Sequence, residues 1–296
     1  MDYNKLINIF HKKKIKICNI YGPTSSGKSS LALCMINKIN SEVVNADSMQ
    51  IYKEVSLLTG QPKVSNNHHL YGYVAMSKKY CLKLWVKDAI NKIEKIILSN
   101  KVAIIVGGTG LYFKSLISGL SLMPEITDED KNKINNILIN NCINKYDILR
   151  KSEFQLIRII NKNDIVRIKR SLEVFIATSQ SILFWQQNTK AYFSSNIFYN
   201  IFIKPERQFL YQKIDKKFKK LLESGAINEV KKLKKKYDIG KIPKIIGLKL
   251  IDNYLKGIIN YNFLVKNGQQ QTKNYAQKQF TWFNNQFIHD IIVNII

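Results

Sequence analysis

Residues 15–29 read IKICNIYGPTSSGKS, and this stretch decides the fold class. After an apolar run typical of a buried strand, it satisfies the pattern G-x-x-x-x-G-K-[ST]. Such glycines let the backbone approach a polyphosphate, and successive N–H groups form an anion-binding nest. The helix expected over Ser29–Ile39 points its positive end at the same place. The sequence therefore predicts a di- or triphosphate site formed by Gly22, Pro23, Thr24, Ser25, Ser26, Gly27, Lys28 and Ser29, with the Ser29 hydroxyl on Mg²⁺.

The chain is strongly basic, with 47 Lys and Arg against 21 Asp and Glu, a formal net charge of +26. A charge of this size suggests a polyanionic partner such as nucleic acid. A second explanation is the heavy use of Lys, Asn and Ile, which AT-rich codons favour. In that case runs such as Lys216-Lys217 form solvated helix faces. The charge supports nucleic acid binding without establishing it.

Cysteine, histidine and hydropathy patterns argue against other classes of protein. The four cysteines show no C-x-x-C spacing, and the adjacent His68-His69 suit a loop better than a metal site. No apolar run reaches the length that crosses a bilayer, and no cleavage site follows the basic residues His11–Lys14. We therefore expect no zinc and no membrane contact. The expected setting is a reducing cytoplasm, and the expected state is a monomer.

The first third of the chain alternates strand and helix patterns. A short strand over Glu42–Asn45 precedes a looser segment, Lys53–Val74, which contains Pro and Gly. Apolar residues at helical spacing predict an amphipathic helix over Tyr80–Leu98. The continuous apolar run Val102–Val106 is typical of a strand in a buried parallel sheet. This alternation predicts a doubly wound α/β core with ligands at the carboxyl ends of the strands.

The pattern changes near Gly119, where helical and polar sequence begins. Thr127 and Asp164 each fit the start of a helix. Strand-like sequence returns at Ile197–Ile203, Pro205-Glu206-Arg207 opens a long helix, and helices continue almost to the end, the last strong one over Phe263–Phe283.

We predict an α/β fold whose core is a P-loop NTPase-like parallel sheet, formed by residues 1–118 and 197–296. A helical domain is inserted at 119–196, and the C-terminal region is helical.

Two further positions could carry chemistry. Asp47 follows the second strand, close to the phosphate loop, where a carboxylate can act as a general base, help to hold Mg²⁺, or cap a turn. The strand over Val102–Val106 ends on Gly107-Gly108-Thr109 and lacks the Asp that P-loop ATPases usually place there. The glycines would permit close approach of a substrate. Without an acidic residue, this strand end is poorly suited to hydrolysing ATP.

In this order, Gly22–Ser29, Asp47–Tyr52 and Gly107–Phe113 closely resemble motifs of the tRNA dimethylallyltransferases, also called tRNA isopentenyltransferases. The resemblance continues through Asn163-Asp164, Arg167, Arg170–Phe175, Pro205-x-Arg207 and Gln279-x-Thr281-Trp282-Phe283, nearly the whole chain. It implies a P-loop core with a helical insertion. The implied reaction moves a dimethylallyl group from dimethylallyl diphosphate to N6 of the tRNA adenine just 3′ of the anticodon, giving N6-isopentenyladenosine.

The resemblance implies a role for each matching residue. Asp47 would accept the N6 proton, Thr109 would hydrogen-bond near the base, and Lys28, Mg²⁺ and Arg207 would stabilise the diphosphate leaving group. The adenine must leave its stack to react. The implied tRNA contacts, with the helical insertion acting as a clamp, are Asp47, Ser48, Met49, Gln50, Thr109, Lys131, Val166, Arg167, Ile168, Lys169, Arg170, Gly247, Lys249, Gln277, Lys278 and Gln279.

The chain departs from the family pattern at positions expected to contact RNA. Val166 stands where the family usually has Gln, Leu248 where it has Tyr, and Asn284 where it has Arg. These changes remove hydrogen-bond donors and a stacking ring, so we expect weaker RNA anchoring around an unchanged catalytic centre.

Two other functions are compatible with parts of the sequence. A P-loop small-molecule or nucleotide kinase would share the phosphate loop and Asp47, but it gives Gly107–Phe113 no role. A non-catalytic RNA-binding protein would explain the charge but leave the intact phosphate loop unexplained. The amide nest could also hold ATP weakly.

Overall fold

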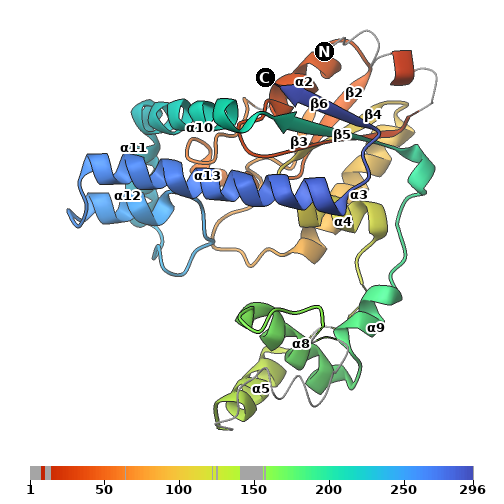
Figure 1. Ribbon diagram of the computed structural model, residues 1–296, viewed down its shortest axis with the longest axis vertical. Coiled ribbons are helices and arrows are strands. Elements are labelled where there is room, and N and C mark those ends of the chain that lie inside the picture. Colours follow the sequence, from red (N-terminus) through yellow and green to blue (C-terminus); the bar gives the residue numbers. More distant parts are fainter. Residues whose placement is uncertain are drawn as a thin grey trace. The chain divides into compact units, whose positions relative to one another are not determined.

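The computed structural model describes residues 8–10, 15–63, 65–121, 123–124, 126–140, 156 and 158–295. The chain divides into two compact units (Figure 1). The first comprises Met1–Ile117 and Phe193–Ile296, and the second comprises Ser118–Tyr192. Among the helices of the described ranges, none is long and apolar enough to cross a membrane.

The first unit is built on a six-stranded sheet with the order β3-β2-β4-β1-β5-β6, and every neighbouring pair is parallel. The strands are β1 (Ile17–Tyr21), β2 (Ser41–Asn45), β3 (His68–His69), β4 (Val102–Gly107), β5 (Phe198–Pro205) and β6 (Ile291–Ile295). All residues of β1 are buried, as expected for a parallel strand covered on both faces. The predicted α/β fold with a parallel sheet is confirmed.

Helices cover both faces of this sheet. They include α2 (Lys28–Ile36), α3 (Leu82–Leu98), α4 (Gly110–Ser118) and part of α13 (Tyr261–Gln286). The helices α10 (Arg207–Leu221), α11 (Ile227–Lys234) and α12 (Leu248–Leu255) pack mainly against α13 or one another. Successive side chains of a strand point to opposite faces. Ile20 therefore packs in a cluster with α2, while Tyr21 packs in another that includes residues of α3, α4 and α13.

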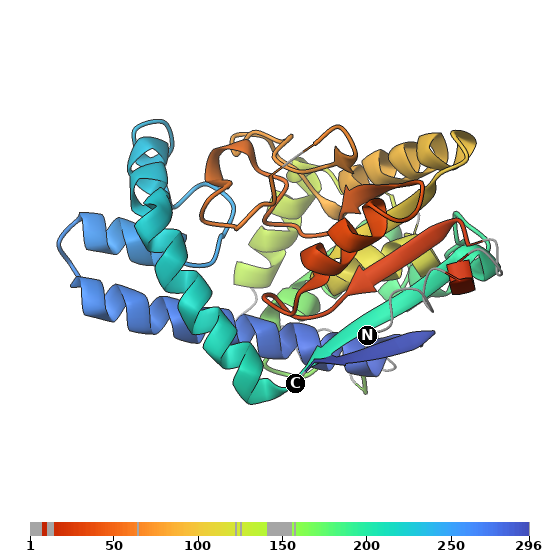
Figure 2. The same cartoon turned by 90° about the horizontal axis from the view of Figure 1, so that it is seen from above.

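The long helix expected after Pro205 is interrupted. Between α10 and α11 lies a single π turn, Leu222–Ala226, in which Gly225 has a φ of 109°. A positive φ of this size favours glycine. Helix α10 packs across α13 (Figure 2). The π turn changes the direction of the chain after α10.

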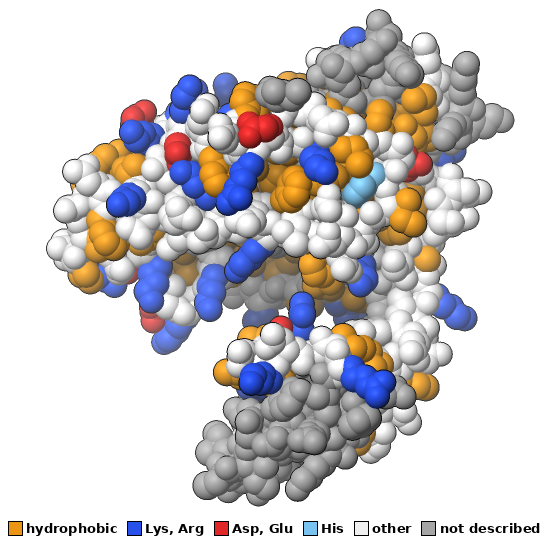
Figure 3. All heavy atoms as spheres, in the orientation of Figure 1, with side chains coloured by type: hydrophobic (Ala, Val, Ile, Leu, Met, Phe, Trp, Pro, Cys, Tyr) orange, Lys and Arg blue, Asp and Glu red, His pale blue; other side chains and the backbone are white. Residues whose placement is uncertain are grey.

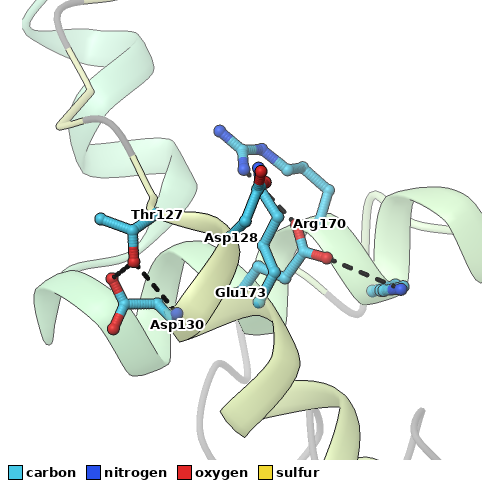
Figure 4. A network of polar contacts seen from close by, with 7 residues as sticks. Thr127, Asp128, Asp130, Arg170 and Glu173 are labelled. Atoms are coloured by element: carbon cyan, nitrogen blue, oxygen red, sulfur yellow. Dashed lines mark hydrogen bonds and ion pairs between the residues drawn. The ribbon is translucent and has the colours of Figure 1, made fainter.

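The second unit contains α5 (Asp128–Asn140), α8 (Ile165–Thr178) and α9 (Ile182–Gln187). Both expected helix starts are confirmed. The Thr127 hydroxyl accepts a hydrogen bond from the Asp130 amide and donates one to its carboxylate (Figure 4). Asp164 Oδ1 accepts from the Arg167 amide at 3.1 Å. These side chains satisfy amide groups that the first turn of a helix leaves unpaired.

Two strands lie where the sequence predicted none. β3 occupies His68–His69, inside the segment expected to be loose, and β6 follows the last helix. β6 is fixed by distant partners: the Ile295 carbonyl accepts from the Glu206 amide at 2.7 Å, and Asp290 Oδ2 accepts from the Asn200 amide at 2.8 Å. A periodicity analysis of the local sequence does not detect such pairing.

Gly107 leads to a test of the sheet. A Cβ built there would lie 2.0 Å from the Ala46 carbonyl oxygen, because β2 and β4 approach each other closely at this point. We expect Gly107→Ala to lower the free energy of unfolding by about 3 kcal/mol or more, since neither backbone can move without parting the strands. Urea denaturation would measure the change. Gly240→Ala is the control, because its added Cβ would meet only Asp238 Oδ1, at 3.4 Å. Equal stability of the two variants would contradict the expectation.

Candidate active site

The phosphate loop connects β1 to α2 and has the backbone that the motif requires. Gly22 has a φ of 154°, and a Cβ there would lie 2.6 Å from the Ile203 carbonyl oxygen. Gly27 has a φ of 98° and stands at the N-cap of α2. Both glycines are therefore needed for the loop's shape.

A polar pocket of about 330 Å³ lies over this loop. Thr24, Ser25, Gly27, Lys28 and Ser29 line it, together with Asp47, Gln50, Gly60, Lys213 and Lys217. Neither lysine of α10 was predicted to be a site residue, and Lys217 was named within a run expected to form a solvated helix face. The two lysines flank the buried residue Ile214 at i and i+4, and this position beside the buried stripe is the signal that could have identified them.

Lys28 lines the polar pocket, and Nζ donates to the Pro23 carbonyl at 2.6 Å. Burial lowers its pKa to about 7, with Lys217 lowering it further and Asp47 opposing the shift. Much of the Lys217 side chain is exposed by area. Its ammonium group nevertheless lies against Gly60 inside the pocket, where burial lowers its pKa and Asp47 again opposes the shift. An anionic ligand would offset the charge that this pocket concentrates.

One polar atom of the loop has no partner. Ser26 Oγ is buried and forms no hydrogen bond among the described residues. Buried hydroxyls are nearly always paired, and this one belongs to a loop whose fold suits phosphate oxygens. The orphaned hydroxyl fits a site whose ligand supplies an acceptor.

Asp47 is fixed at the end of β2 by its neighbours. Its amide donates to Asn45 Oδ1 at 2.9 Å, and its own Oδ1 accepts from the Met49 amide at 3.0 Å. Thr109 Oγ1 accepts from the Ser48 amide at 2.9 Å, and the Thr109 amide donates to the Ala46 carbonyl at 3.1 Å. The carboxylate therefore caps a turn and also lines the pocket, so its capping role is compatible with either of the two chemical roles considered for it.

A second, more apolar chamber of about 70 Å³ adjoins the polar pocket. Thr24, Ser25, Asp47, Gln50 and Lys217 line both. The remaining walls come from Met49, Leu58, Thr59, Ile214, Phe218, Leu221, Ile245, Ile246, Thr272 and Tyr275. Burial raises the pKa of Tyr275, whose hydroxyl lies near Thr109 and Gln279. The polar pocket and the more apolar chamber thus meet at Asp47.

Gln279 occupies a different position from the RNA contact that was expected. Its side chain is 5% exposed, Oε1 accepts from the Thr24 amide, and Nε2 donates to the Gly108 carbonyl, both at 2.8 Å. Both ends of the amide are used inside the protein. Gln279 therefore ties the phosphate loop to the end of β4.

The glycines at the end of β4 and directly after it make room for the protein itself, and Gly107 also lines the polar pocket. A Cβ on Gly107 would meet the Ala46 backbone, one on Gly108 would lie 2.1 Å from Gln279 Nε2, and one on Gly110 would lie 2.0 Å from the Trp282 ring.

Arg207 does not line the pocket that holds Lys28. It lines a separate pocket with Pro205, Tyr211 and Phe280, and its Nε donates to the Tyr211 hydroxyl at 3.2 Å. Its guanidinium lies over the Tyr211 ring. In this structure the phosphate pocket takes its cations from Lys28, Lys213 and Lys217 instead.

Several residues of the first unit that were expected to contact RNA are not free to do so. Gly247 is buried as the N-cap of α12, with a φ of 82°. Leu248 is buried in the core, so the view of it as a missing RNA-stacking ring is wrong. Gln50 donates to the carbonyls of Thr59 and Gly60. Lys249, Gln277 and Lys278 remain exposed, and Lys and Arg side chains are frequent on the face that carries α10 and α13 (Figure 3).

The second unit contains the other six expected RNA contacts, namely Lys131, Val166, Arg167, Ile168, Lys169 and Arg170. Ile168 is a correction, because its side chain is buried with Leu172 in the core of this unit. Val166 is 80% exposed, and Arg167 is exposed beside Asp164.

Like Arg167, whose Nε lies 3.4 Å from Asp164 Oδ2, three further cations in the described part of the second unit have carboxylate partners. Arg170 and Lys169 both pair with the mostly buried Glu173, at 3.4 and 3.8 Å (Figure 4). Lys131 pairs with Asp128 at 2.8 Å. A phosphate would have to compete with these pairs.

The pocket residues fit Mg²⁺ as part of a substrate complex. Ser29 and Asp47 line the same pocket and offer hard oxygen ligands. Within the described ranges, no group of three or more His, Cys, Asp or Glu could hold a metal ion by itself. That arrangement suits an ion that takes one or two protein ligands and completes its shell with phosphate oxygens and water.

Replacement of Gln279 tests its role as a tie. Gln279→Leu keeps the shape but leaves the Thr24 amide and the Gly108 carbonyl unpaired, at about 1–3 kcal/mol for each buried group. We expect a lower free energy of unfolding and weaker binding of inorganic pyrophosphate. Urea denaturation and calorimetry would measure both. Gln277→Leu, on the exposed side of the same helix, should change neither quantity, and an equally harmless Gln279→Leu would refute the role.

The lowered pKa of Lys28 predicts proton uptake on binding. The lysine is mostly uncharged above pH 7 in the empty pocket, and a bound phosphate raises its pKa. Binding of inorganic pyrophosphate should therefore take up a proton, and this contribution to affinity should fall by up to about tenfold per pH unit above pH 7. Calorimetry at pH 7, 8 and 9, in buffers of different ionisation enthalpy, counts the protons. Lys28→Met should take up one fewer, and an unchanged count would exclude the shift.

Comparison with known proteins agrees with these features. Residues 50–286 match the family model described as IPP transferase, and residues 15–71 match one described as isopentenyl transferase. The tRNA dimethylallyltransferase of Wolbachia pipientis subsp. Culex pipiens (strain wPip) is 36% identical over 294 residues, covering 95% of this chain and 96% of the relative. That of Pelagibacter ubique (strain HTCC1062) is 37% identical over 278 residues, covering 91% and 88%.

Two solved structures resemble this one. The tRNA delta(2)-isopentenylpyrophosphate transferase of Staphylococcus epidermidis superposes with a TM-score of 0.63 at 27% identity, covering 94% of this chain and 92% of that chain. A eukaryotic dimethylallyltransferase acting on tRNA superposes with a TM-score of 0.77, covering 90% and 69%, and at 24% identity it supports the fold alone. By motif, sequence identity and fold, the chain belongs to the tRNA dimethylallyltransferase family.

Proposed function

We propose that this protein transfers the dimethylallyl group of dimethylallyl diphosphate to N6 of the tRNA adenine on the 3′ side of the anticodon. The observation that carries the proposal is the meeting of a phosphate pocket and an apolar chamber at Asp47. A prenyl diphosphate has both parts, a charged head and a short hydrocarbon tail. A nucleotide kinase would need the chamber for a polar acceptor instead.

The leaving group is the main target of catalysis. As the allylic carbon separates from diphosphate, negative charge grows on the phosphate oxygens, and fixed donors stabilise it. The loop amides, Lys28 and Lys217 surround that position. Lys28 becomes charged when the diphosphate binds, because attraction to the anion raises its pKa against the lowering effect of burial.

The acceptor is activated by proton removal. The exocyclic N6 loses a proton as it bonds to the allylic carbon, and the Asp47 carboxylate, held between Asn45 and Met49, is placed to take it. Thr109 and Tyr275 supply hydroxyls beside it for the edge of the base. When bound through Ser29 and the phosphates, Mg²⁺ neutralises charge on the diphosphate.

The RNA is held by exposed basic and polar residues outside this pocket. In the first unit these are Lys249, Gln277 and Lys278, and in the second they are Arg167 and the surface around Val166. Arg170 and Lys169 contribute less, since Glu173 already pairs with both. Contacts of this kind to phosphates position the RNA without reading its sequence.

Asp47→Asn tests the proposed base. Asparagine can still accept from the Met49 amide, so the turn should persist, while the general base is lost. We expect kcat to fall by roughly 10²–10⁴-fold with little change in tRNA affinity. Single-turnover assays with labelled dimethylallyl diphosphate would measure it, with the exposed Asp238→Asn as control. A near-normal rate in Asp47→Asn would exclude this role.

The choice of substrate is tested by incubating the protein with tRNA and either labelled ATP or labelled dimethylallyl diphosphate. We expect label to move to tRNA from the prenyl donor, without steady phosphate release from ATP. Phosphate release stimulated by tRNA would contradict the proposal and favour a kinase or ATPase.

A further inference from the structure

One wall of the apolar chamber is a surface turn formed by residues 56–60. Residues 56–60 follow a short 3-10 helix, Lys53–Val55. Leu58 and Thr59 of this turn line the apolar chamber, and Gly60 lines the polar pocket. Leu58 is buried, whereas Ser56 and Leu57 face solvent. A wall formed by a single turn stays at a fixed distance from the rest of the chamber only if other elements hold it by hydrogen bonds.

A carboxylate from another element fastens this turn. Glu229 of α11 accepts hydrogen bonds from the Leu57 amide at 2.8 Å and the Leu58 amide at 2.8 Å, through different oxygens. The Ser56 hydroxyl donates to the same side chain at 3.3 Å. Hydrogen bonds to a charged acceptor are stronger than neutral ones. These contacts occupy amides that the start of a helical turn leaves without backbone partners.

A second fastening comes from inside the site. Gln50 Nε2 donates to the Thr59 carbonyl at 3.0 Å and to the Gly60 carbonyl at 3.2 Å. Glu229 thus holds the amides at the front of the turn, and Gln50 holds the carbonyls at its back. Glu229 does not itself line either pocket, so any effect on the ligand must pass through the turn.

We infer that Glu229 is a positioning residue that sets the chamber wall against the hydrocarbon part of the donor. The inference rests on the proposed function, in which the chamber holds the dimethylallyl group. Its consequence is selective: Glu229 favours binding of the prenylated diphosphate and contributes little to the phosphate head, which the loop and the lysines hold.

Two ligands that share the head separate these effects. Calorimetry with Mg²⁺ would measure dimethylallyl diphosphate and inorganic pyrophosphate on wild type, Glu229→Ala and Glu229→Gln. We expect Glu229→Ala to bind dimethylallyl diphosphate about tenfold more weakly. This is the effect of losing one or two hydrogen bonds to a charged acceptor, because the chamber wall is then no longer held in place. Pyrophosphate affinity should stay within about twofold. Glu229→Gln, which keeps one acceptor oxygen, should fall between wild type and Glu229→Ala.

Controls cover charge and folding. Glu223→Ala removes an exposed carboxylate from the nearby π turn and should bind both ligands as wild type does. Leu58→Ala, which removes the wall's own side chain, should show the same selective loss. The Leu58→Ala and Glu229→Gln losses should also combine to less than their product. If Glu229→Ala does not fold, Glu229→Gln and Leu58→Ala still carry the test.

The outcomes are distinguishable. A wild type that binds dimethylallyl diphosphate no better than pyrophosphate would overturn the proposed function itself. A wild-type preference that survives in the Glu229 variants, or an equal loss for both ligands, would overturn only the role of Glu229.

Discussion

The buried amide of Gln279 joins the two loops on which the site depends. One of its ends accepts from Thr24 in the phosphate loop, and the other donates to Gly108 after β4. Asp47 follows β2, which neighbours β4 on the side away from β1, and it is tied to the end of β4 through Ala46 and Thr109. A change at Gln279 therefore reaches the phosphate loop directly and Asp47 indirectly. Gly108 has no side chain because one would occupy the position of this amide.

Predictions from sequence succeeded where the information is local. A few neighbouring residues determine the phosphate loop, the strand before that loop and the strand before Asp47. The same is true of the helix starts at Thr127 and Asp164. The resemblance supplied the family. The positions of Lys217 and Gln279, and the pairing of β6, depend instead on contacts between residues far apart in the chain. The spacing of Lys217 beside the buried stripe of α10 marks it as a candidate, but only the contacts of the folded chain show that it lines the pocket.

The same reasoning explains the corrected positions. Ile168 and Leu248 fall within segments that match RNA-contacting motifs, yet each lies on the apolar stripe of an amphipathic helix and is buried. Arg207 matches the motif, but the first turn of α10 directs it to Tyr211. A motif fixes which segment is involved, while helical periodicity decides which of its side chains are free. Both must be applied to each residue.

The dependence of the N-terminal loop on Gln279 has a consequence for the order of synthesis. Ribosomes deliver a chain from its N-terminus, so the phosphate loop, Asp47 and the end of β4 emerge well before α13 and β6. Until Gln279 emerges, 255 positions after Thr24, the loop amide and the Gly108 carbonyl have no partner from α13. Until β6 emerges, β5 likewise lacks the strand that pairs with it on that side. The tie between the phosphate loop and the end of β4 therefore forms only after α13 has emerged, and a nascent chain that has not reached Gln279 lacks it.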